Sequence, residues 1–164
     1  MKKLALSLLT IAIAGVAFTS CKKDDNDNKM PDPKPVAQMT LYDSLDGTQM
    51  VNDPSNPGQM IEKGRLGIRS VVDSTIFVIA ADPKLNGFFP VLLSEVTAGN
   101  LSGFQALSKN LTDFFCVATG AKNFTYTGLN MVDAHDPAKN PRMNGKASSA
   151  HFDQFVADLV IGGN

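Results

Sequence analysis

The stretch that decides the fold reads Tyr126-Thr-Gly-Leu-Asn-Met-Val-Asp-Ala-His135 and, after a polar loop, continues as Ala150-His-Phe-Asp-Gln-Phe-Val-Ala-Asp-Leu159. This pattern predicts two short helices separated by a turn-rich linker. His135 falls in the last turn of the first helix, four residues after Met131, so their side chains share one helix face. A His at the end of an apolar face is a candidate axial ligand for haem iron, and it is also a common residue of packed cores.

Two longer helices are predicted upstream of this stretch. In the first, from about Gln59 to Ala81, apolar residues recur with a helical period at Ile68, Val71, Val72, Ile76, Ile79 and Ala80. Asp82-Pro83 ends this helix. In the second, the same period is carried by Phe104, Leu107, Leu111, Phe114, Phe115 and Ala118, and Gly120 is its expected C-cap.

The remaining segments connect these helices. Thr40 and Asp43 resemble a capping box and predict a short helix to about Leu45, ended by Gly47. We expect a loop at 52–58, a compact turn at 85–90, and a loop between short helical pieces at 91–103. No segment carries a strong strand pattern, so the fold class is predicted to be all-α.

The N-terminus has the pattern of an export signal. Lys2 and Lys3 precede an apolar run from Leu4 to Phe18, which is short for a membrane span. Small residues then lead to Cys21, an order that resembles a bacterial lipoprotein signal and implies a lipid on Cys21; the alternative is an ordinary secretory leader. We therefore expect a signal peptide at 1–20, a disordered tether at 21–37 and a folded domain at 38–164, lipid-anchored in the bacterial cell envelope, in the periplasm or facing the outer membrane.

Charge and cysteine content exclude some functions. Without Lys2 and Lys3 the chain has 13 basic and 16 acidic residues, so no basic surface is available to neutralise nucleic acid. If Cys21 carries lipid, Cys116 has no disulfide partner and is expected to be a buried, inert thiol. No Cys-x-x-Cys-His motif is present to attach a c-type haem.

Several short motifs occur in an order that resembles the group 1 truncated haemoglobins. They are Leu41-Tyr-Asp-Ser-Leu, Val71-Val-Asp, Ala81-Asp-Pro-Lys-Leu-Asn-Gly-Phe-Phe89, Phe114-Phe115, Tyr126-Thr-Gly, Met131 with Ala134-His135, and His151-Phe152. The resemblance covers about Leu41 to Leu159. It implies a two-over-two helical sandwich that holds haem b.

The resemblance also implies roles for individual residues. His135 matches the proximal iron ligand, with Met131 and Ala134 on the proximal wall and Tyr126 near the haem edge. Phe89 matches a residue that packs on the ring, and the distal and inner wall is implied to consist of Ile76, Phe77, Leu107, Leu111, Phe114 and Phe115. From its place near a helix start, His151 is expected to be a surface or capping residue.

Three features depart from the family. Ile76 and Leu111 stand where the family has polar distal residues, so we expect an apolar distal pocket that holds oxygen poorly. The loop from Asp136 to Lys146 is longer than usual, and Arg142 or Lys146 could reach a haem propionate. The chain ends at Asn164, so we expect the globin domain to be incomplete, without the family's final helix.

The sequence therefore predicts reversible binding of oxygen, nitric oxide or carbon monoxide at a haem iron held by His135. One alternative is a haem enzyme that removes nitric oxide or acts as a peroxidase, which would need an unidentified reductase. Another is a haem-free helical lipoprotein that serves as an interaction module.

Overall fold

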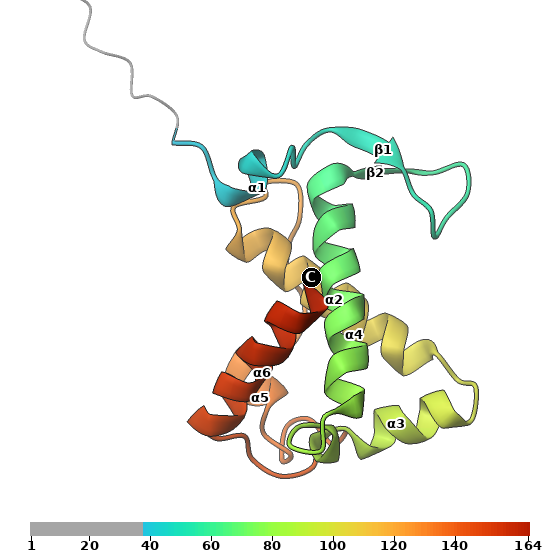
Figure 1. Ribbon diagram of the computed structural model, residues 1–164, viewed down its shortest axis with the longest axis vertical. Helices are drawn as coiled ribbons and strands as arrows, with labels where there is room; N and C mark the ends of the chain where they lie inside the picture. The colour runs from blue at the N-terminus through green and yellow to red at the C-terminus, as the bar shows by residue number, and fades with distance from the viewer. Residues whose placement is uncertain (1–37) are drawn as a thin grey trace, which may run out of the picture. The chain divides into compact units, whose positions relative to one another are not determined.

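The computed structural model describes residues 38–164, and within them helices predominate (Figure 1). The predicted signal peptide, Cys21 and the tether lie outside the described residues. The elements in chain order are α1 (Leu41–Ser44), β1 (Met50–Asn52), β2 (Met60–Glu62), α2 (Lys63–Ala81), the 3-10 turn η1 (Asn86–Phe88), α3 (Pro90–Thr97), α4 (Ser102–Ala118), α5 (Met131–Ala134) and α6 (Ser149–Gly162).

The first helix starts as its sequence predicts. The Thr40 hydroxyl accepts from the Asp43 N–H at 3.1 Å, and the Asp43 carboxylate accepts from the Thr40 N–H at 3.0 Å. This reciprocal pair satisfies two N–H groups that a helix start leaves free. Tyr42 is the buried residue of this helix, with 1% of its surface exposed.

A two-stranded antiparallel sheet precedes α2, where helix and loop were predicted. Val51 pairs with Ile61, and α2 begins at Lys63 rather than near Gln59. Each strand has three residues, too few for alternation to be recognised in a sequence. The hairpin loop is held by Asp53, whose carboxylate accepts from the Ser55 N–H and the Asn56 amide.

Helix α2 is the centre of the described domain. It packs against both α6 and α4, and Figure 1 shows it running through the middle of the arrangement (green). Its buried apolar residues are Val72, Ile76 and Ile79. It ends at Ala81, as the Asp82-Pro83 step predicts, because proline at 83 supplies no N–H and disfavours a helical residue before it.

The segment at 91–103 is more regular than predicted. Pro90 occupies the first turn of α3, where its missing N–H costs nothing, and the helix continues to Thr97. Gly99, at φ +79°, then allows the reversal into α4. Gly120 follows α4 at φ +98°, so its predicted role at the helix end is confirmed.

The core is apolar with several buried polar groups. Besides the α2 residues it contains Leu85 and Cys116, and Cys116 is fully buried as expected. Thr75, Thr112 and Asp158 are also almost completely inaccessible. The all-α class is thus confirmed in its coarse form, with the small sheet as an addition.

Candidate functional site around His135

His135 lies at the C-terminal end of α5, and its ring is oriented by its own helix. Nδ1 is 2.7 Å from the carbonyl oxygen of Met131. Because a carbonyl oxygen can only accept, Nδ1 must carry the proton in this contact. In the neutral imidazole the lone pair is then on Nε2, which is the atom a metal would bind. The residue is exposed.

His151, the other histidine, has the opposite arrangement. Its Nδ1 accepts from the backbone N–H of Ser148 at 3.0 Å, as part of a capping box at the start of α6. In the neutral form the proton is therefore on Nε2. The ring also packs edge-on against Phe88, with centroids 4.8 Å apart. Of the two predicted roles, surface residue or helix cap, the structure shows the second.

Three of the predicted site residues, one before α5 and two on α4, form a row of aromatic contacts. The ring of Tyr126 packs edge-on against Phe114 at 5.7 Å, and Phe114 packs against Phe115. The Tyr126 hydroxyl donates to the carbonyl of Leu129 at 2.5 Å, which fixes the turn before α5. Met131 is 38% exposed and Ala134 is half-buried.

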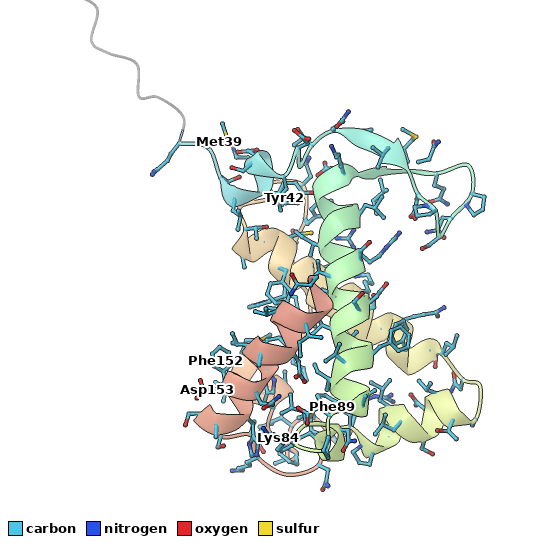
Figure 2. The ribbon with its side chains drawn as sticks, in the orientation of Figure 1. Met39, Tyr42, Lys84, Phe89, Phe152 and Asp153 are labelled. Carbon is cyan, nitrogen blue, oxygen red and sulfur yellow. The ribbon has the colours of Figure 1, made fainter. Side chains whose placement is uncertain are left out.

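The residues predicted for the distal and inner wall are spread over α2 and α4. Ile76 is buried in the core at 6% exposure, whereas the neighbouring Phe77 is 62% exposed and contacts Phe104 of α4 at 5.3 Å. Leu107 and Leu111 are half-buried on α4. Phe89 follows η1 at the lower end of α2, near Lys84 (Figure 2).

The loop after α5 is fastened to α3 and η1. Both terminal nitrogens of Arg142 pair with the Glu95 carboxylate, Nη1 at 2.9 Å from Oε1, and this interaction lowers the pKa of Glu95. Asn144 donates its N–H to the Phe88 carbonyl and its amide to the Gly87 carbonyl. Arg142 thus has a protein partner in this structure, and Lys146 is exposed.

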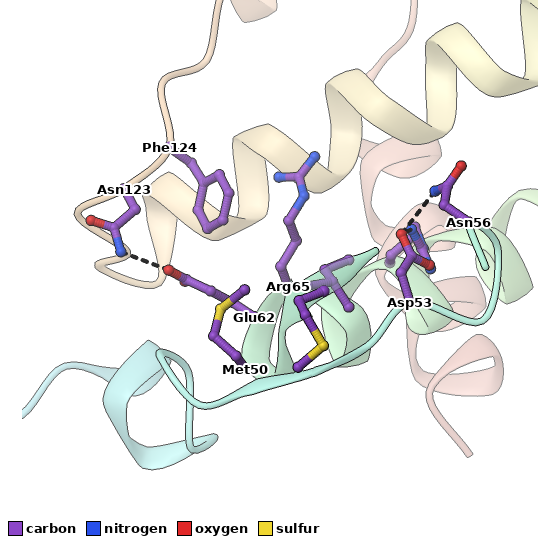
Figure 3. A pocket seen from close by; sticks show the side chains of 10 residues that line it. Met50, Asp53, Asn56, Glu62, Arg65, Asn123 and Phe124 are labelled. Atoms are coloured by element: carbon purple, nitrogen blue, oxygen red, sulfur yellow. Dashed lines mark hydrogen bonds and ion pairs between the residues drawn. The ribbon is translucent and has the colours of Figure 1, made fainter. Parts of the chain in front are cut away.

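An open hollow of about 440 Å³ lies elsewhere, beside the hairpin (Figure 3). Arg65 stands in it with its guanidinium 4.6 Å from the Phe124 ring centre and one nitrogen 2.6 Å from Asp113. Arg69 pairs with Asp53 at 2.7 Å and, with the other bonds to Asp53, lowers its pKa. The sequence analysis did not predict these two ion pairs, because the paired residues are far apart in the chain. Each arginine in the hollow is neutralised by its aspartate.

His135 offers one imidazole nitrogen, which is the single ligand that a haem iron can take from a histidine of the protein. Within residues 38–164 no three His, Cys, Asp or Glu side chains gather in a way that could hold a metal ion. Apolar side chains near His135 in the chain are exposed, including Val132 at 79%.

In the described part of the chain, no helix combines the length and apolar content needed to cross a membrane. No family model, curated protein or solved structure matches the chain.

Proposed function

We propose that this chain is a globin-like haem-binding protein in which His135 would hold the iron and the bound haem would take up a diatomic gas. The observation that carries the proposal is the contrast between the two imidazoles. His135 has its Nδ1 proton bonded to Met131 and its Nε2 lone pair free, whereas His151 uses its Nδ1 lone pair to cap α6. The resemblance of the ordered motifs to truncated haemoglobins, and a two-over-two arrangement, belong to this proposal.

The residues of this chain would do two things at such a site. The bond from His135 Nδ1–H to the Met131 carbonyl fixes the tautomer and the ring orientation and makes Nε2 a better donor. Met131, Ala134 and Tyr126 would line the proximal side. The bound haem would supply an iron that takes up oxygen, nitric oxide or carbon monoxide reversibly.

The residues that would line the other wall offer no strong hydrogen-bond donor. Ile76, Phe77, Leu107 and Leu111 are all apolar, and Thr75 already donates its hydroxyl to the Val71 carbonyl at 2.7 Å. A hydrogen bond to a charged acceptor contributes about 1.5–3 kcal/mol, so its absence lowers oxygen affinity about ten- to hundredfold. Carbon monoxide, which is less polar, loses less. We therefore propose that the site favours carbon monoxide over oxygen.

A haem titration of the purified protein tests the proposal. His135→Ala should remove most haem retention and the associated Soret absorption, because it deletes the free Nε2. His151→Ala should retain haem, although it weakens the start of α6 by about 1 kcal/mol because the Ser148 N–H loses its acceptor. Equal retention in His135→Ala, or loss confined to His151→Ala, would contradict the assignment.

The proposal includes attachment to a bacterial membrane through lipid on Cys21, which rests on the sequence alone. Cys21→Ser should leave the exported protein unacylated and release it into the soluble fraction, because the acyl chains on Cys21 supply the membrane affinity in this proposal. Membrane pelleting and mass spectrometry would measure this. A Cys21→Ser protein that still sediments with membranes in the absence of detergent contradicts the lipoprotein assignment.

A second candidate function, a haem-free interaction module, is favoured by one observation. The apolar stripe of α6 consists of Phe152, Val156 and Val160, which are 63%, 41% and 61% exposed. Their spacing of four residues places them on one helix face. Exposed apolar stripes of this kind often mark binding surfaces. Absence of a Soret band after haem addition to the parent protein would favour this second function.

A further inference from the structure

The segment Asp136–Lys146, here called the strap, is fastened at three places. At its start the Asn140 amide donates to the Ala134 carbonyl at 2.9 Å. In its middle Arg142 pairs with Glu95 on α3. Near its end Asn144 donates to the carbonyls of Phe88 and Gly87 at 3.0 and 3.1 Å. The strap therefore connects the end of α5 to two elements that lie more than forty residues earlier in the chain.

Helix α5 itself has little to hold it in place. It has one turn, none of its four residues is buried, and it packs extensively against no other helix or strand of the described domain. A single turn is not stable by itself. Its position must therefore be set by the segments on either side, which are the turn fixed by Tyr126 and the strap.

We infer that the Arg142–Glu95 ion pair is a latch that positions His135 by holding the strap against α3. Arg142 and Glu95 are thus positioning residues, since neither contacts His135. The expectation that the latch slows haem release rests on the proposed function above. The expectation that it stabilises the end of α5 does not.

The Arg142–Glu95 ion pair of the latch is expected to be weak. The side chains of Arg142 and Glu95 are 46% and 23% exposed, so salt screens their attraction and the pair is weak. Breaking one such exposed pair changes a local opening equilibrium about two- to fivefold. Added salt should have the same effect on the parent protein and none on a variant that lacks the pair.

Gly103 gives a way to open the latch without removing a charge. A Cβ at this position would lie 2.0 Å from Glu95 Oε2 and 2.4 Å from Arg142 Nη2. Both atoms are at the ends of flexible side chains, so the pair would separate while the backbone stays in place. Gly103→Ala should therefore act in the same direction as Glu95→Gln.

Amide hydrogen exchange of the full chain without haem is the first test. Glu95→Gln should speed exchange about two- to fivefold both at Met143 and Asn144 in the strap and at Ala134 and His135 at the end of α5. The matched control is Asp46→Asn, which breaks an exposed ion pair with Lys63 and should leave these amides unchanged. Acceleration confined to Met143 and Asn144 would overturn the inference.

Charge reversal tests whether the pairing itself is responsible. Glu95→Arg and Arg142→Glu should each speed exchange at Ala134 and His135, and the double variant should be slower than either single variant. If the double variant is no slower, the latch is refuted. A general structural defect would give additive effects instead.

Haem release to an excess of a haem acceptor protein is the second test. Glu95→Gln should release haem about two- to fivefold faster than the parent, with Asp46→Asn unchanged. If exchange responds as expected but the parent binds no haem, the latch stands and the proposed function fails. If the parent binds haem but neither exchange nor release responds to Glu95→Gln, the proposed function stands and the latch is refuted.

Discussion

Asp113 is held by two cations of different exposure. Arg65 and Lys109 approach its two carboxylate oxygens at 2.6 and 2.7 Å, and their side chains are 19% and 62% exposed. Burial raises the pKa of Asp113, but the hydrogen bonds from Lys109 and Arg65 outweigh burial and lower it below its ordinary value. The carboxylate is therefore charged at neutral pH and balances Arg65 in the partly buried wall beside the hairpin.

Replacing Asp113 should be costly, because Arg65 would lose its carboxylate. We expect Asp113→Asn to lower the free energy of unfolding by about 2–3 kcal/mol, less than for a fully buried pair. Lys109→Met should cost less than about 1 kcal/mol, since that cation is mostly in water. Urea unfolding followed by circular dichroism measures both. Equal costs would mean that Arg65 does not depend on Asp113.

The lowered pKa of Asp113 also predicts how the stability of the protein changes in acid. A carboxyl group whose pKa is lower in the folded than in the unfolded state stabilises the fold above its unfolded pKa and loses this contribution as pH falls through the folded pKa. The Asp113 contribution should thus be complete at neutral pH, should begin to fall near the unfolded pKa of about 4, and should disappear only below the lower folded pKa. The parent and Asp113→Asn should therefore converge in stability under acid. A constant difference down to pH 2 would contradict this.

At the scale of the elements, α6 lies close against α2 where Gly162 meets Thr75. A Cβ on Gly162 would lie 2.4 Å from the Thr75 hydroxyl and 2.7 Å from its backbone nitrogen. Backbone atoms in the middle of a helix cannot move aside as a flexible side chain can. Glycine at this position therefore allows the two helices to pack at the observed distance.

Gly162→Ala should therefore destabilise the protein even though alanine favours helices. We expect a loss of about 1–3 kcal/mol from overpacking. The control is Gly67→Ala in α2, where the added methyl meets nothing within 4 Å and should stabilise by about 0.5–1 kcal/mol. Thermal unfolding of the two variants should shift in opposite directions. A stabilised Gly162→Ala would show that α6 does not approach α2 this closely.

Sequence patterns predicted the long elements better than the short ones. The apolar period and the Asp82-Pro83 step located α2, and Gly120 located the end of α4. The strands were missed, because three residues show no period, and the start of α3 was missed because Pro90 was interpreted as part of a turn; only short helical pieces were expected from 91 onward. At the site, the sequence predicted that His135 ends a short helix that contains Met131, because these residues are only four apart in the chain. The Arg142–Glu95 pair joins residues 47 apart, so no local pattern could reveal it.

At the scale of the whole described domain, apolar surface remains uncovered. The apolar stripe of α6 is exposed, and Ile161 beside it is 59% exposed (Figure 2 labels Phe152 at the start of the stripe). A continuous apolar face on one helix costs free energy in water, at about 25 cal/mol per Å². The haem-free protein should reduce this cost by covering the face, and a second molecule at high concentration is the nearest source of apolar surface.

We therefore expect the haem-free Cys21→Ser protein to associate reversibly through the apolar stripe. Replacing Phe152 with Gln and Val160 with Lys together should abolish this association and reduce binding of a hydrophobic dye. The free energy of unfolding should change by less than about 0.5 kcal/mol per site, because both side chains are largely in water. Leu101→Gln, at a single 50% exposed position between α3 and α4, is the control and should leave association unchanged. Sedimentation velocity over a range of concentrations measures the effect. If the double variant associates as strongly as the parent, another surface must be responsible, and the stripe would then lose its support as a binding face.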